Sequence, residues 1–76
     1  MKNVKVYSTP TCPYCTMVKS WLEKKGIEYQ DVNVAADQNA AQEIVSKTGQ
    51  MAVPVTEIDG KFVIGYDVQS LEKLLS

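Results

Sequence analysis

Residues 8–19 read STPTCPYCTMVK, and this stretch contains both cysteines of the 76-residue chain. Cys12 and Cys15 are separated by two residues, the first of which is Pro13. Proline suits the first position of a helix, because the N–H that it lacks would be unpaired there anyway. Apolar side chains then recur at helical spacing, at Val18, Trp21 and Leu22. The stretch therefore predicts a helix that begins at the cysteine pair, with Cys12 at or next to its N-cap.

Strand patterns lie on both sides of this predicted helix. Residues 3–8 alternate apolar and polar side chains, which predicts a strand before the cysteine pair. Gly26 is placed to end the helix as its C′ residue, and residues 27–34 then predict a second strand. A β-α-β unit of this kind implies two parallel strands joined by a right-handed crossover.

A second helix is expected after the second strand. Asp37 or Asn39 can cap it, and Gly49 would end it. Its expected apolar face consists of Ala40, Ala41, Ile44, Val45 and Thr48.

A β-hairpin and a last helix complete the pattern. Asp59-Gly60 joins the runs VTEI and KFVI, and an Asp-Gly pair favours a type I′ turn. Gly65 would end the hairpin, and Asp67 can cap the final helix. The order β-α-β-α-β-β-α predicts an α/β fold, with a four-stranded mixed sheet flanked by three helices. Residues 1–76 contain no linker or repeat, so we expect a single domain.

Composition excludes several classes of function. Eight lysines oppose nine acidic residues and the net charge is −1, so there is no electrostatic case for nucleic acid. Apolar runs are too short for a membrane helix, and the N-terminus lacks the apolar region of a signal peptide, so we expect a cytoplasmic location. Histidine is absent, which excludes Cys-His catalysis and a Cys2His2 zinc site. No apolar patch argues for an oligomer, so we expect a monomer.

The cysteine pair indicates redox chemistry. A helix N-terminus offers unpaired N–H groups and a partial positive charge, and both favour the thiolate, which is the attacking species. Cys12 would lie at the exposed end, whereas Cys15 would turn toward the apolar face. We therefore expect Cys12 to attack a substrate disulfide and Cys15 to resolve the mixed disulfide that forms. The alternative, two buried neighbouring cysteines without a role, fits this spacing less well.

With these motifs the chain resembles the glutaredoxin family, which has the thioredoxin fold. The motif CPYC follows a short first strand, AVP at residues 52–54 takes the place of the family's cis-proline loop, and GYD at residues 65–67 takes that of the turn into the last helix. The resemblance covers nearly the whole chain. It implies a cis Val53-Pro54 bond, and a Val53 backbone free to pair with a substrate strand by β-augmentation.

The resemblance also implies a set of groove residues. Pro13 and Tyr14 would tune the stability of the disulfide, and Tyr14 would flank the groove. Further substrate contacts are implied at Thr9, Thr11, Val53, Pro54, Gly65, Tyr66 and Asp67. For several of them a structural role is the alternative: Thr11 would shape the turn, Tyr66 would pack, and Asp67 would first cap the last helix.

Two departures from the family pattern concern the electron donor. Glutathione-using members often have a lysine or arginine where this chain has Thr9, and paired aspartates where it has only Asp67. Both losses remove partners for glutathione, although Lys19 or another lysine could compensate. No tightly bound cofactor is expected. The donor could be glutathione or thioredoxin reductase, and the short turn resembles small glutaredoxin-like proteins that supply electrons to ribonucleotide reductase.

Other functions compete with disulfide reduction. Some glutaredoxins bridge an iron–sulfur cluster between two chains, in which case Cys12 would be the ligand; otherwise no metal is expected. A copper chaperone also uses a C-x-x-C pair, but the element order here differs. A binding module without redox activity would need a cysteine pair that cannot be oxidised reversibly.

Overall fold

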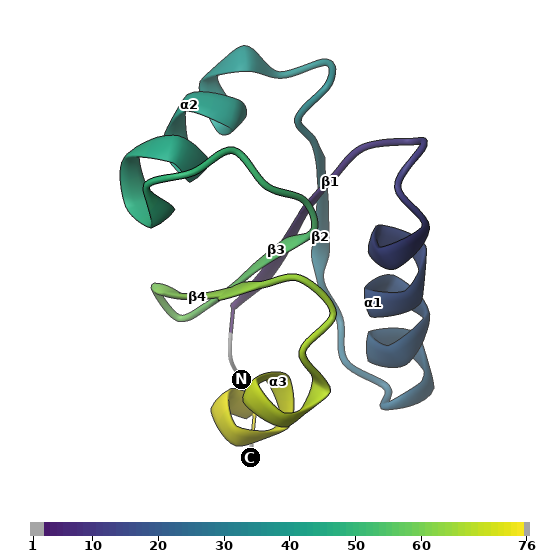
Figure 1. Cartoon of the computed structure of the whole chain (residues 1–76). Helices are drawn as coiled ribbons and strands as arrows, with labels where there is room; N and C mark the ends of the chain where they lie inside the picture. The colour runs from purple at the N-terminus through teal and green to yellow at the C-terminus, as the bar shows by residue number, and fades with distance from the viewer. Residues whose placement is uncertain (1–2, 76) are drawn as a thin grey trace.

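The computed structural model describes residues 3–75 and shows the predicted order of elements (Figure 1). These are β1 (Val4–Ser8), α1 (Pro13–Lys24), β2 (Gln30–Asn33), α2 (Gln38–Thr48), β3 (Val55–Ile58), β4 (Lys61–Ile64) and α3 (Val68–Leu75). None of the helices in this part of the chain has the length and apolarity needed to cross a bilayer.

The four strands form one mixed sheet in the order β2-β1-β3-β4. β1 pairs in parallel with β2 and antiparallel with β3, and β3 continues into the antiparallel hairpin with β4. The predicted thioredoxin-like α/β fold is therefore confirmed. β1 is a central strand, and the cysteine motif begins four residues after its last residue, Ser8.

Helices cover both faces of the sheet, α1 and α3 on one side and α2 on the other (Figure 1). The first core cluster joins α1 and α3 to the sheet, and the second joins α2 to it. Successive β1 side chains serve opposite clusters: Val6 belongs to the first and Tyr7 to the second. The alternation of residues 3–8 places Tyr7 on the polar side of the strand together with Lys5. That expectation is wrong, because α2 covers Tyr7 and leaves it 2% exposed.

Helix ends and turns follow the predicted chemistry. Gly26 and Gly49 adopt φ values of 72° and 79°, which β-carbon sterics make costly for other residues. Asp37, rather than Asn39, caps α2, and its carboxylate accepts the Ala40 N–H at 3.2 Å. In the hairpin, φ is positive at both Asp59 and Gly60, as a type I′ turn requires.

The second strand is shorter than predicted. Residues 27–34 read as one strand, but only Gln30–Asn33 pairs with β1. The parallel register begins at Lys5 opposite Gln30, one residue after β1 begins, so residues 27–29 lie beyond the pairing. Ile27 and Tyr29 instead pack against the first core cluster.

Candidate active site

The site lies in the loop that connects β1 to α1. The Cys12 N–H donates to the Thr9 carbonyl at 3.4 Å, which closes the turn after the strand. Cys12 is the N-cap of α1 and Pro13 occupies the first turn, as predicted. The Cys12 sulfur accepts the backbone N–H of Cys15 at 3.1 Å. A helix N-terminus therefore points one of its unpaired donors at this sulfur.

The two cysteines have different environments. Cys15 is 1% exposed, whereas Cys12 is partly exposed, and both are free thiols in this structure. The pKa of Cys15 is raised to about 11, chiefly by burial and then by the hydrogen bond and the negative charge of Cys12. A hydrogen bond from the Thr9 backbone and the charge of Lys19 act in the opposite direction on this pKa. The accessible sulfur and the buried, protonated one are thus suited to different steps.

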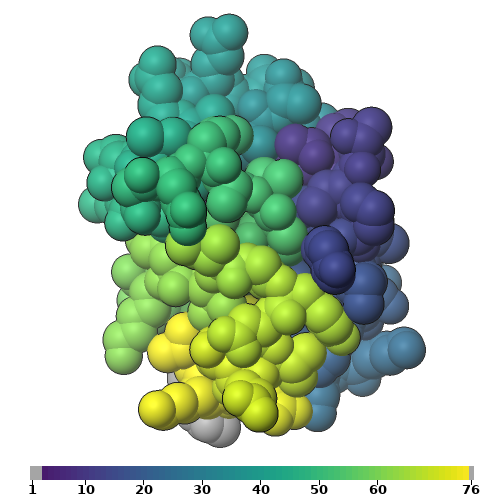
Figure 2. All heavy atoms as spheres, viewed as in Figure 1, coloured from purple at the N-terminus to yellow at the C-terminus, as the bar shows by residue number. Residues whose placement is uncertain are grey.

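The proline loop lies beside the cysteine motif. The Val53-Pro54 bond is cis, which confirms the expectation, and the Gly65 N–H donates to the Pro54 carbonyl at 2.8 Å. Tyr7 pairs with Val55, so the end of β1 and the start of β3 lie at the same end of the sheet. Figure 2 shows atoms of the cysteine segment, the loop before β3 and the turn after β4 on one face of the molecule. Among the described residues, the Val53 backbone N–H and C=O have no hydrogen-bond partner.

Exposed side chains of aromatic or apolar type belong to these segments. Tyr14 is 59% exposed, Met51 54% and Tyr66 37%. The predicted groove residues Thr9 and Thr11 are partly exposed and exposed. An apolar side chain left in water is a source of binding energy for a partner that covers it.

Asp67 serves the last helix. Its Oδ1 accepts the Ser70 N–H at 3.3 Å, and its Oδ2 accepts the Ser70 hydroxyl at 2.8 Å. The expected capping role is confirmed, and both carboxylate oxygens are engaged in it.

A polar network joins the cysteine helix to the neighbouring strands β1 and β2, and the sequence did not reveal it. Lys19 Nζ lies 3.0 Å from Asp31 Oδ2, and the buried Ser8 hydroxyl donates to Asp31 Oδ1 at 2.9 Å. The three residues come from α1, β2 and β1. Lys19 was expected only as a substitute contact for glutathione, because no local pattern links it to an aspartate twelve residues away.

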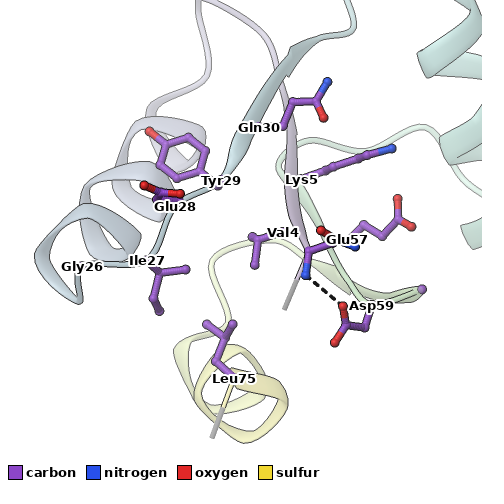
Figure 3. Close-up of a pocket in the computed structure, with 12 residues that line it drawn as sticks. Val4, Lys5, Gly26, Ile27, Glu28, Tyr29, Gln30, Glu57, Asp59 and Leu75 are labelled. Carbon is purple, nitrogen blue, oxygen red and sulfur yellow. Dashed lines mark hydrogen bonds between the residues drawn. The ribbon is translucent and has the colours of Figure 1, made fainter. Parts of the chain in front are cut away.

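A hollow of about 930 Å³ lies at the opposite end of the sheet, between the beginnings of β1 and β2 (Figure 3). Ile27, Tyr29 and Leu75 are among the side chains that line it. Burial and a hydrogen bond to Glu23 raise the pKa of Tyr29 to about 12, so its hydroxyl stays protonated at neutral pH. Neither cysteine borders this hollow, and we do not place the redox site there.

Comparisons with known proteins show the family to which the chain is similar. The sequence model of the glutaredoxin family matches residues 4–63. An uncharacterised glutaredoxin-like 8.6 kDa protein of the rubredoxin operon in Clostridium pasteurianum is 43% identical, over 95% of this chain and 96% of that relative. Glutaredoxin 3 of Escherichia coli K12 is 33% identical, over 88% of this chain and 81% of its own.

Solved structures show the same fold. A glutaredoxin from Archaeoglobus fulgidus matches with a TM-score of 0.88 at 25% identity, over 99% of this chain and 87% of that one. A buckwheat glutaredoxin in complex with glutathione matches with a TM-score of 0.81 at 27% identity. The match covers 97% of this chain and 74% of that one. The glutaredoxin-like NrdH-redoxin of Escherichia coli matches with a TM-score of 0.87 at 21% identity, over 95% of this chain and 93% of that one. That protein has a thioredoxin-like activity profile.

Proposed function

Because the chain belongs to the glutaredoxin family, we propose that it is a thiol–disulfide oxidoreductase that reduces protein disulfides through Cys12 and Cys15. One observation carries the proposal above the others. The partly exposed Cys12 sulfur receives a helix N-terminal N–H, while Cys15 lies one turn further on and is 1% exposed. A substrate disulfide can therefore reach only the first sulfur, and the second sulfur is held in reserve behind it.

The reaction follows from this arrangement in two displacements. The Cys12 thiolate attacks one sulfur of the substrate disulfide, and the other substrate sulfur leaves as a thiolate and takes up a proton. Cys15 then loses its proton and attacks the Cys12 sulfur. The Cys12–Cys15 bond forms, the bond to the substrate breaks, and the second substrate thiol is released. The substrate gains two electrons and two protons, and the protein leaves as a disulfide.

Substrate binding rests on the loop before β3. The unpaired N–H and C=O of Val53 offer a donor and an acceptor to an extended segment that lies beside it, as in β-augmentation. Tyr14 and Tyr66 are exposed in the neighbouring segments and would cover the apolar side chains of that segment. This surface suits an extended stretch of a protein partner that contains the disulfide.

We further propose that a thioredoxin reductase, rather than glutathione, returns the electrons. Asp67 is a single carboxylate whose two oxygens each already accept a hydrogen bond from Ser70, so fewer acceptor positions remain for the glutathione ammonium group. The Lys19 ammonium is paired with Asp31, and Thr9 carries no charge for a glutathione carboxylate. The buckwheat neighbour binds glutathione, but these three features of the present chain favour the flavoprotein donor.

The test is NADPH consumption with an added protein disulfide as the terminal acceptor. One arm contains thioredoxin reductase, and a second contains glutathione and glutathione reductase. A third arm replaces NADPH and the reductases with dithiothreitol, and reduction of the protein disulfide is followed directly and compared with the rate without the chain. We expect turnover in the first and third arms, with the second at least about tenfold slower, since lost charge-assisted contacts cost 1.4 kcal/mol or more. Equal rates in the first two arms would contradict the proposed donor. No exchange in the dithiothreitol arm would contradict the oxidoreductase function itself.

A further inference from the structure

The Lys19 ammonium of α1 is paired with a carboxylate of β2, which in turn is hydrogen-bonded to a hydroxyl of β1. Lys19 follows Cys15 by four residues, so the two side chains lie on the same face of α1, one turn apart. One carboxylate oxygen of Asp31 in β2 lies 3.0 Å from the Lys19 ammonium nitrogen. The other oxygen accepts a hydrogen bond from the Ser8 hydroxyl at 2.9 Å. Ser8 is 3% exposed and the Lys19 side chain 23%, whereas the Asp31 side chain is 50% exposed, so the ammonium is partly shielded from solvent on the side of the sheet. A charge in such a position acts more strongly than one on the surface.

The resolving step requires that Cys15 lose its proton, which a nearby positive charge favours. Cys15 is 1% exposed, and burial together with the neighbouring Cys12 raises its pKa to about 11, so near neutral pH it is a thiol. Only a thiolate attacks a disulfide. The second displacement therefore depends on whatever favours loss of the Cys15 proton at the moment when the mixed disulfide exists.

Formation of the mixed disulfide changes the surroundings of Cys15. In the free dithiol, the hydrogen bond and the charge of Cys12 both raise the pKa of Cys15. When the Cys12 sulfur is bonded to a substrate sulfur, it carries no negative charge, and these two contributions vanish. The hydrogen bond from the Thr9 backbone and the Lys19 charge, which is the smallest contribution in the free dithiol, remain, and both lower the pKa of Cys15.

We propose that Lys19, oriented by Asp31 and Ser8, is a positioning residue for the resolving step, in which its fixed charge favours the Cys15 thiolate once Cys12 is bonded to substrate. This inference rests on the proposed function. The step that it assists is the second displacement: Cys15 gives its proton to solvent, its sulfur bonds to Cys12, and the substrate sulfur leaves with the electron pair. The groups that act on Cys15 are Cys12 and Lys19 from α1 and the Thr9 backbone after β1, with Asp31 of β2 behind Lys19.

The experiment separates the two displacements. One equivalent of 5,5′-dithiobis(2-nitrobenzoic acid) is mixed with the reduced protein in a stopped-flow instrument, and release of the coloured thiolate is followed. Attack by Cys12 releases the first thiolate in a bimolecular phase, and attack by Cys15 releases the second in a unimolecular phase. For Lys19→Met we expect the second phase to slow about fivefold or more at pH 7, with its pH midpoint raised, because a nearby positive charge is lost. The first phase should change less than about twofold, since Lys19 acts on the buried sulfur.

Two further variants control for charge and structure. Lys24→Met removes the same charge from the exposed end of α1, and it should leave both phases within about twofold of the original, since exposed charges are screened. Lys19→Arg keeps the charge and should restore most of the second-phase rate. A Lys19→Met second phase equal to that of Lys24→Met, with an unchanged pH midpoint, would overturn the inference. Absence of the first phase in the original protein would overturn the proposed function, and the role of Lys19 with it.

Discussion

Cys12→Ser is expected to reduce disulfide-reductase turnover at least about 1,000-fold, because a serine hydroxyl is not ionised near neutral pH and has no base beside it. The chain has no histidine that could activate such a hydroxyl. The measurement is the dithiothreitol-driven reduction of a protein disulfide, compared with the original protein at equal concentration.

Cys15→Ser is the matched control for this prediction. It keeps the accessible sulfur and the helix N-terminus, so the first displacement should proceed and the mixed disulfide should accumulate. Mass spectrometry of the unreduced sample would detect that adduct on Cys15→Ser and none on Cys12→Ser. An adduct on Cys12→Ser, or turnover within tenfold of the original, would show that Cys15 is the attacking residue.

Ile44→Ala is expected to lower the free energy of unfolding by about 2–5 kcal/mol, through lost burial and the cavity that remains. Ile44 is fully buried and joins α2 to Tyr7 and Val55 in the second core cluster. The total free energy of unfolding of a domain is on the order of 5–15 kcal/mol, so this change is a large part of its stability. Urea denaturation followed by far-ultraviolet circular dichroism would measure it.

The neighbouring position provides the comparison. Val45 is 44% exposed on the same helix, so Val45→Ala removes apolar atoms that are already partly in water. It should cost less than about 1 kcal/mol, since exposed substitutions have small effects. If Ile44→Ala costs no more than Val45→Ala, α2 is not attached to the sheet through the second core cluster.

Local chemistry explains which parts of the fold could be predicted from the sequence. The predictions of a turn at Asp59-Gly60 and of a helix end at Gly49 are correct. Both positions have positive φ values, which only a few residue types adopt readily. The prediction of Cys12 as N-cap is also correct, because Pro13 marks the first position of the helix. The cis Val53-Pro54 bond came from the family resemblance and not from local pattern.

The incorrect parts depend on partners that are distant in sequence. Val45 was placed on the buried face of α2, but the helix has one sheet face to cover, and Ile44 and Ala40 occupy it. Trp21 does pack against the first cluster, as its place beside Val18 and Leu22 on the apolar face indicates, but it is only partly buried there. The extent of each contact is set by the neighbouring element, which periodicity alone does not reveal.

The candidate site shows the same division. The cysteine pair, the proline loop and the turn at Gly65 could be found by motif, because each motif is continuous in sequence. The contact of Lys19 with Asp31 and Ser8 needs the parallel pairing of β1 and β2, which places the three side chains together. That pairing was predicted as topology, but its register was not.

The position of β1 has a consequence for the lifetime of the active structure. β1 is hydrogen-bonded on both sides, whereas β2 and β4 are edge strands with one neighbour each. Fluctuations that open an edge strand expose fewer backbone amides than those that open the centre, and they cost less free energy. We therefore expect amide protons of β1 to exchange with solvent more slowly than those of β2 and β4. β1, which precedes the cysteine motif, would stay hydrogen-bonded while the edge strands β2 and β4 open transiently.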